Sequence, residues 1–227
     1  MKKKFYTESA YVLGLVFLAL GTALIARGDF GMSVVVAPAY IIYLKVSESL
    51  PFFTFGMSGY LFQGVLLLLA ALIRKKWKRS YLLTFCSVVL YGFLLDGITL
   101  AVALLPAGEL WQRILWYFGG QIIACGGISL LFHTYLPMQG YELFVKELAD
   151  TFGWNLYRCK TGYDCVNGLI AVGLSFAFFG FGQLRGIHWG TLLTAGINGW
   201  MISRWTKYFQ RFYDFTDRFP GRKFFQS

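Results

Sequence analysis

Asp96 is the residue whose type and position most strongly suggest chemistry, because its carboxylate interrupts a long apolar run. At least ten uncharged residues precede it and at least ten follow it. A charge at the centre of a bilayer costs at least about 2.5–3.5 kcal/mol, so such a residue usually faces a cavity or a partner. The sequence therefore makes Asp96 a candidate proton or cation site. The alternative is an acid near a helix break at Gly97 that bonds to a neighbouring helix.

Two amides and a second acid are further candidates for a polar site. Gln63 and Asn167 lie in apolar stretches that correspond in an internal repeat described below, and Asp164 stands about one helical turn before Asn167. Paired amides could bind a polar substrate, or they could join helices by hydrogen bonds worth about 0.6–2 kcal/mol each. Asp164 could equally be an interfacial acid beside Lys160.

The segment from Gln139 to Asp150 mixes charged and apolar residues in a helical pattern. Glu142, Lys146 and Asp150 recur every four residues and would share one helix face, where Glu followed by Lys is a favourable pair. The segment is either a solvated cytoplasmic helix or a half-helix that lines an aqueous vestibule, with Glu142 nearest the turn. In the second interpretation the N-terminus at Gln139 would offer free N–H groups and a positive dipole end to anions.

Other kinds of chemistry find little support in the sequence. The four cysteines are scattered without a CxxC pair, and His133 and His188 lie far apart, so no metal site and no cofactor are expected. The chain has no HExxH motif, no nucleophile elbow and no phosphate loop. We therefore expect that it is not an enzyme. An intramembrane pair of Ser58 and His188 is the enzymatic alternative.

The elements that would position these residues are membrane-spanning helices. Hydrophobic residues make up 57% of the 227 residues, charged residues only 14%, and the mean hydropathy is +0.56. A soluble domain carries about 25% charged residues, so the sequence indicates an all-α polytopic membrane protein. A crossing helix needs roughly 20 residues. Apolar runs of about that length occupy 10–26, 51–73, 80–105, 114–133, 165–184 and 186–203.

The chain also repeats itself. The stretch YVLGLVFLALGTALIARGDFGM from Tyr11 aligns without a gap on YFGGQIIACGGISLLFHTYLPM from Tyr117. The glycines and the final Met keep the same register in both copies, which favours a duplication over chance similarity. The alignment predicts a first repeat over 1–109, a second repeat over 110–204 and a basic aromatic tail over 205–227.

Two shorter, more polar segments occupy equivalent places in the repeats, at 30–46 and 136–152. Non-helical backbone at membrane depth is tolerated where protein or a water-filled cavity satisfies it. The turns that lead into these segments, at Met32 and Met138, would therefore face inward. Both residues join the acids and amides above as candidates for substrate binding.

The formal net charge of +10 indicates an orientation. Most of the 21 Lys and Arg fall in the blocks Lys2–Lys4, Arg74–Arg79 and Arg204–Lys223. Eight crossings would place the Arg74–Arg79 block outside, against the positive-inside rule. Six crossings, with the two short segments re-entrant or half-helical, place all three blocks and both termini in the cytoplasm. Three crossings per repeat invert the second repeat, the layout of many secondary transporters with a midplane site.

Several motifs resemble those of a known family. A GxxxxxxG pattern in the first helix, a short FGMS..V.AP segment and a late GIHWGTLLTAGINGWMISRW stretch resemble the YczE/YyaS/YitT group of bacterial integral membrane proteins. Gly190, Thr191 and Gly199 match the last-helix pattern of that group, whereas Ser203 stands where the family often has an acid. The resemblance covers most of the chain and implies a plasma-membrane protein of a group often presumed to transport something.

The duplication and Asp96 favour a small-molecule or ion transporter of the bacterial plasma membrane, working by alternating access with a site near the repeat interface. The alternatives are a substrate-binding or accessory subunit of a larger membrane complex and, third, an intramembrane enzyme. The expected partners are the lipid bilayer, an unknown small-molecule or ion substrate, and a second copy or a partner subunit. Nucleic-acid binding is not expected, since the tail suits an amphipathic helix on the anionic inner leaflet.

Overall fold

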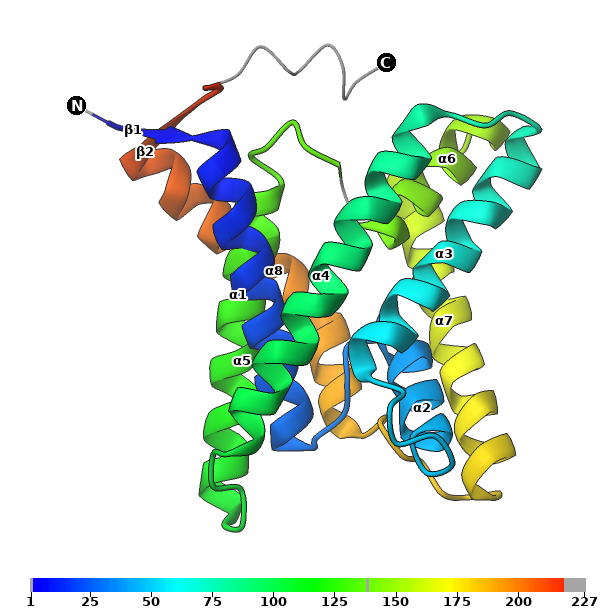
Figure 1. The fold of residues 1–227 in the computed structure, drawn as a ribbon. Helices are drawn as coiled ribbons and strands as arrows, with labels where there is room; N and C mark the ends of the chain where they lie inside the picture. The colour runs from blue at the N-terminus through cyan, green and yellow to red at the C-terminus, as the bar shows by residue number, and fades with distance from the viewer. Residues whose placement is uncertain (1, 138, 219–227) are drawn as a thin grey trace. The chain divides into compact units, whose positions relative to one another are not determined.

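The computed structural model describes residues 2–137 and 139–218, and helices make up most of that part of the chain (Figure 1). Two short strands, β1 (Lys3–Tyr6) and β2 (Tyr213–Thr216), accompany them. The helices are α1 (Thr7–Gly28), α2 (Ala37–Val46), α3 (Phe55–Arg74), α4 (Arg79–Ala103), α5 (Leu110–Leu131), α6 (Gly140–Phe152), α7 (Leu156–Phe179) and α8 (Trp189–Phe212). The predicted all-α polytopic class is confirmed.

Five helices are long and apolar enough to cross a membrane: α1, α3, α4, α5 and the Arg158–Phe179 part of α7. They correspond to five of the six expected spans. The sixth, α8, has 24 residues, but it is not among them because polar residues such as Asn198 and Arg204 interrupt its apolar sequence. The two short segments form α2 with 10 residues and α6 with 13. At about 1.5 Å per residue both are shorter than the hydrocarbon core.

The chain divides into two compact units, and each draws on both halves of the sequence. Helices α4 and α8 contribute to both units, since the boundaries fall within them. Unit 1 consists of Met1–Phe30, Leu94–Leu136 and Leu192–Ser227. Unit 2 consists of Gly31–Phe93 and Pro137–Thr191.

The centre of unit 1 is the packing of α1 against α5, which lie side by side in Figure 1. Glycines let the two backbones touch. A Cβ atom at Gly21 would lie 2.6 Å from the carbonyl oxygen of Gly120, and one at Gly127 would lie 2.7 Å from that of Gly14. Because the earlier glycine of each helix meets the later glycine of the other, α1 and α5 run antiparallel.

At another part of unit 1, β1 pairs in parallel with β2, with Lys3 opposite Tyr213. Phe5, Trp205 and Tyr213 pack around buried Ala10 and Phe209 there. The tail expected to be an amphipathic helix therefore continues α8 only to Phe212 and then turns into a strand. The helical prediction was wrong for Tyr213–Thr216, because pairing with β1 satisfies backbone groups that a helix would satisfy internally. Residues 219–227 of the predicted tail lie outside the described residues.

Unit 2 contains α2, α3, α6, α7 and the first part of α4. Helix α6 packs against α3 and α7, and α2 packs against the same two helices. The buried apolar core of this unit joins α3, α4, α6 and α7. Its members are Leu66, Ala70, Tyr81, Tyr141, Phe144, Val145, Ala149, Cys159 and Tyr163.

Candidate functional site

The candidate site lies in unit 2, where α6 begins. The carboxamide oxygen Oε1 of Gln63 on α3 accepts a hydrogen bond of 2.8 Å from the backbone N–H of Gly140. Gln63 is 1% exposed, so this bond satisfies one of the orphan N–H groups at the helix start away from water. A Cβ atom at Gly140 would lie 3.0 Å from Cβ of Gln63. Glycine at this position therefore lets α6 start directly against α3.

Helix α7 presents a polar stripe to the same region. Lys160, Tyr163, Asp164 and Asn167 recur at intervals of three and four residues, so they share one helix face. The ammonium of Lys160 lies 3.5 Å from Oδ1 of Asp164. Asn167 is 2% exposed, and its amide faces the Tyr163 hydroxyl without a hydrogen bond of ordinary geometry.

Glu142, in the first turn of α6, completes the arrangement. Its carboxylate lies close enough to Lys160 and Asp164 for their charges to interact. Burial raises the pKa of Glu142 above its usual value of 4.5, and the positive charge of Lys160 opposes this effect. Burial also raises the pKa of the neighbouring Tyr141 hydroxyl well above its usual value. The site thus holds a carboxyl group for which the uncharged form is favoured by its surroundings.

Several buried polar atoms around the start of α6 have no hydrogen-bond partner among the described residues. Native interiors leave few such atoms unpaired. A group of them in one place therefore indicates a site for water, an ion or a polar ligand. We give the name α6 cluster to the residues Gln63, Gln139, Glu142, Lys160, Tyr163, Asp164 and Asn167. The atoms without a hydrogen bond are Gln139 Oε1, Glu142 Oε2, Tyr163 Oη, Asn167 Nδ2 and Asp164 Oδ1, and the last of these has only the ion-pair contact with Lys160.

The structure thus brings together five of the residues that the sequence singled out: Gln63, Gln139, Glu142, Asp164 and Asn167. Asp96 is not among them. It is half-buried on α4, in the part of that helix that belongs to unit 1, where it has an interaction partner.

The two methionines singled out at the turns have different outcomes. Met32 lies in unit 2, is buried, and donates its backbone N–H to the carbonyl oxygen of Gly186 at 2.9 Å. Its main chain therefore anchors the turn before α2 to the loop between α7 and α8. Met138 lies outside the described residues.

Sequence reasoning missed a second buried polar group, in unit 1. The carboxamide of Gln121 on α5 donates a hydrogen bond to Asn198 on α8 and lies near the Cys125 thiol. Both amides interrupt apolar helices, as Gln63 and Asn167 do, so the same signal was present in the sequence. The repeat did not indicate Gln121, because the equivalent residue in the first repeat is Leu15 and the two positions form no pair of amides.

An ion-pair network holds the other part of α6 in place. Glu147 is 4% exposed. It pairs with the guanidinium of Arg74 at the end of α3 and with the ammonium of Lys78, the latter at 2.7 Å. Asp150 lies 3.7 Å from Arg74 and is half-exposed. Within the described residues, the basic block between α3 and α4 is therefore neutralised in part by α6.

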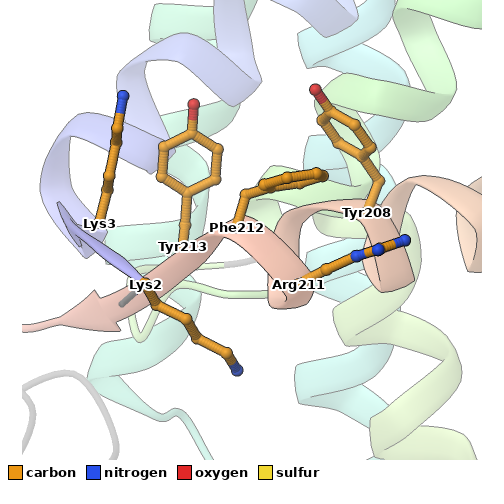
Figure 2. Close-up of a pocket in the computed structure, with 6 residues that line it drawn as sticks. All are labelled: Lys2, Lys3, Tyr208, Arg211, Phe212 and Tyr213. Carbon is orange, nitrogen blue, oxygen red and sulfur yellow. The ribbon is translucent and has the colours of Figure 1, made fainter.

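A shallow surface cavity of ≈ 290 Å³ lies in unit 1, beside the paired strands. Its lining is basic and aromatic, and Figure 2 shows the side chains diverging: Lys3 and Tyr213 extend side by side while Lys2 points away from them. The lining residues are Lys2, Lys3, Tyr208, Arg211, Phe212 and Tyr213. Across residues 2–137 and 139–218, no group of three or more His, Cys, Asp or Glu is placed to hold a metal ion.

Comparison with known proteins gives a family but no relative of known activity. No curated protein and no solved structure shows significant similarity to the chain. A family model described as a family of unknown function, DUF6198, matches residues 5–207. This match includes every described helix apart from the last turns of α8. The chain, with its helices of membrane-spanning length and composition, therefore belongs to DUF6198, a family of unknown function.

Proposed function

We propose that this protein is a transporter of the bacterial plasma membrane that moves a small polar molecule or ion by alternating access, with the α6 cluster as its binding site. The observation that carries the proposal is the set of unpaired buried polar atoms around the start of α6. Burying such atoms costs free energy unless something pairs with them. A polar solute held there during transport would provide the missing partners. The resemblance to the YczE/YyaS/YitT group, which is often presumed to transport something, favours the same proposal.

The contacts within unit 2 support an arrangement as two inverted repeats. The pair formed by α3 and α6 becomes the pair formed by α7 and α2 when the repeats are exchanged, and both pairs are in contact. The exchange also holds to within one residue. Gly140 contacts Gln63, and the position equivalent to Gly140, Val34, lies 3.5 Å from where a Cβ atom would stand at Gly168, the residue after Asn167. The α6 cluster therefore combines α3 of the first repeat with α6 and α7 of the second.

The direction of equivalent helices supports six crossings over eight. With eight crossings, α1 and α5 would cross in the same direction, but they pack antiparallel. Arg113, at the start of α5, accordingly lies 3.0 Å from Asp29 at the end of α1. Arg185, after α7, lies 3.7 Å from Glu48, after α2, whereas eight crossings would place these two residues on opposite sides. This arrangement and the positive-inside rule support the proposal of six crossings with cytoplasmic termini.

Uptake into proteoliposomes tests the proposal. The purified chain is reconstituted alone, and uptake of radiolabelled small polar solutes is measured with and without a pH gradient. Asn167→Leu should abolish uptake at unchanged thermal stability, because it removes a donor from the site. Lys146→Gln, an exposed position on the same helix as Glu142, should transport normally and is the matched control. Flux that requires an added partner would instead favour an accessory subunit of a larger complex.

Asp96 stays the candidate coupling residue outside the α6 cluster. Asp96→Asn keeps the size of the side chain but removes its charge. If Asp96, rather than an acid of the α6 cluster, carries the coupled ion, this variant should abolish solute-coupled ion movement while the protein still folds and reaches the membrane. Unchanged coupling in the same proteoliposomes would remove Asp96 from the mechanism and leave the acids of the α6 cluster.

The enzymatic alternative receives no support from the surroundings of Ser58. Its hydroxyl donates a hydrogen bond of 2.5 Å to the carbonyl oxygen of Ala39 and is buried. A nucleophilic serine instead donates its proton to the base that activates it. The bond to Ala39 fits a role in joining α2 to α3, as the contact between these helices requires.

A further inference from the structure

We infer that the α6 cluster exchanges a proton for a small protonated amine at the carboxyl group of Glu142, so that transport of the amine is an antiport with protons. This inference rests on the proposed function and deepens it by naming the substrate class and the coupled ion. It follows from the charges that meet at Glu142, from their burial, and from the kinds of atom left unpaired.

The charges around Glu142 do not balance when every acid is ionised. Helix α7 presents Lys160, Asp164 and the neutral Tyr163 hydroxyl to it. Helix α6 adds the neutral Tyr141 hydroxyl, and α3 contributes the uncharged amide of Gln63 at the start of α6. Two carboxylates therefore share one ammonium. The side chains of the cluster therefore carry one net negative charge, which the backbone N–H of Glu142 and the positive N-terminus of α6 offset only in part, so a proton or another monovalent cation can bind there.

Burial makes this neutralisation necessary. An ionised carboxylate removed from water is strongly destabilised unless it is paired, and it otherwise takes up a proton. Oε2 of Glu142 is buried without a hydrogen-bond partner among the described residues. Burial also raises the pKa of this group, as expected for a carboxyl that holds a proton when the site is empty. A bound cation and the proton would then compete for the same oxygen.

The unpaired atoms indicate an amine rather than a metal ion. Glu142 and Gln139 each offer an acceptor oxygen without a partner among the described residues, Asp164 offers one that Lys160 contacts at 3.5 Å, and an ammonium group has three N–H donors. Hard metal ions prefer several carboxylate oxygens in a tight shell, and no such group exists within the described chain. The unpaired donors, Tyr163 Oη and Asn167 Nδ2, would bind an oxygen atom of the ligand. The substrate class is therefore a small primary amine that carries a hydroxyl or carbonyl oxygen.

The exchange conserves charge and protons. The O–H bond of protonated Glu142 breaks, the proton leaves to water, and the carboxylate accepts N–H hydrogen bonds from the entering ammonium group. One positive charge leaves as another arrives, so the net charge of the occupied site equals that of the protonated empty site. On the opposite side of the membrane, protonation of Glu142 would release the amine.

Isothermal titration calorimetry on the purified protein tests this exchange with ethanolamine as the probe. Titrations in buffers of different ionisation enthalpy give the number of protons released, which should approach one at a pH below the pKa of Glu142. In that range the affinity should rise about tenfold per pH unit. Ethylene glycol, which replaces the ammonium by a hydroxyl, should bind at least tenfold more weakly, since hydrogen bonds to charged groups are the stronger ones.

Two variants and a control complete the test. Glu142→Gln should release no proton and lose at least tenfold in affinity, while Lys146→Gln should behave as the unmodified protein. Tyr163→Phe, which keeps the apolar contacts, should weaken binding but still release the proton. Ethanolamine binding without proton release, or uptake of another solute with no ethanolamine binding, would overturn the inference. Proton-coupled binding without uptake would instead support the site and reject transport.

Discussion

The antiparallel contact between α1 and α5 predicts that neighbouring glycines respond in opposite ways to the same substitution. Gly120 and Gly119 are adjacent on α5. A Cβ atom at Gly120 would lie 2.7 Å from the carbonyl oxygen of Gly21 and 2.9 Å from the backbone nitrogen of Ile25. One at Gly119 would meet nothing within 4 Å. Alanine at Gly120 therefore forces two backbones apart, whereas alanine at Gly119 points into open space.

The size of the effect follows from the overlap. Carbon contacts are most favourable at about 3.5–4.0 Å, so Gly120→Ala requires a separation of roughly 1 Å. Overpacking of this kind costs about 1–3 kcal/mol, and the upper end is expected because the obstructing atoms belong to the backbone. Gly119→Ala should be neutral or stabilising by up to about 1 kcal/mol, from the higher helix propensity of alanine.

Thermal unfolding of the detergent-purified variants measures this difference. At about 2–4 °C per kcal/mol for a chain of this size, Gly120→Ala should unfold some 5–10 °C below Gly119→Ala. Gly97→Ala on α4, where a Cβ atom also meets nothing within 4 Å, is a second control. Equal midpoints for Gly120→Ala and Gly119→Ala would refute the close antiparallel contact.

Three further measurements address unit 2. Glu147→Gln should lower stability by about 3 kcal/mol, the low end for breaking a buried ion pair because both cationic partners are partly exposed. Asp150→Asn, at an exposed and longer contact, should cost under about 1 kcal/mol. Equal losses of thermal stability in the Glu147 and Asp150 variants would contradict the greater contribution of the buried pair. Burial raises the pKa of Glu142 above 4.5, so the folded state binds this proton more tightly than the unfolded chain does. Stability should therefore fall as pH rises from 4.5 through the raised pKa, and Glu142→Gln should flatten that part of the plot of stability against pH. Parallel plots for the two proteins would argue against a raised pKa of Glu142. A cysteine in place of Lys76, in a chain without the native cysteines, should not react with an impermeant maleimide in intact cells, because six crossings place this residue in the cytoplasm. Strong labelling would instead favour eight crossings.

The sequence predicted the helices well where hydrophobicity decides. The apolar runs located α1, α3, α4, α5 and most of α7, because an uncharged stretch of about 20 residues has few alternatives to a buried helix. The short segments were recognised by their polar residues, and they form α2 and α6. Boundaries were less accurate at α8, which continues to Phe212 because its charged last turns still form helical hydrogen bonds.

Long-range pairing was beyond the sequence. Lys3–Tyr6 and Tyr213–Thr216 each have the composition of a charged or aromatic flank, and only their parallel pairing makes them strands. Among the site residues, type and spacing located Gln63, Glu142 and Asn167. That Gln63 would bind the start of α6, and that Glu142 would face Lys160 and Asp164, depends on how three helices pack. Asp96 looked most prominent because of its isolation, but isolation along the chain says nothing about neighbours in space.

The two attachments of α6 to α3 have a mechanical consequence. Gln63 holds the first residue of α6, and Arg74, about three turns of helix α3 further on, holds Glu147. A helix fixed at two points to the same neighbour can neither slide along it nor rotate about its own axis. Helices α3 and α6 should therefore move as one rigid body. Among the described residues, α7 is joined to α6 by apolar packing and by the hydrogen bond that the Cys159 thiol donates to the Val145 carbonyl oxygen, and not by an ion pair. We therefore expect displacement of α7, rather than separation of α6 from α3, to open the α6 cluster.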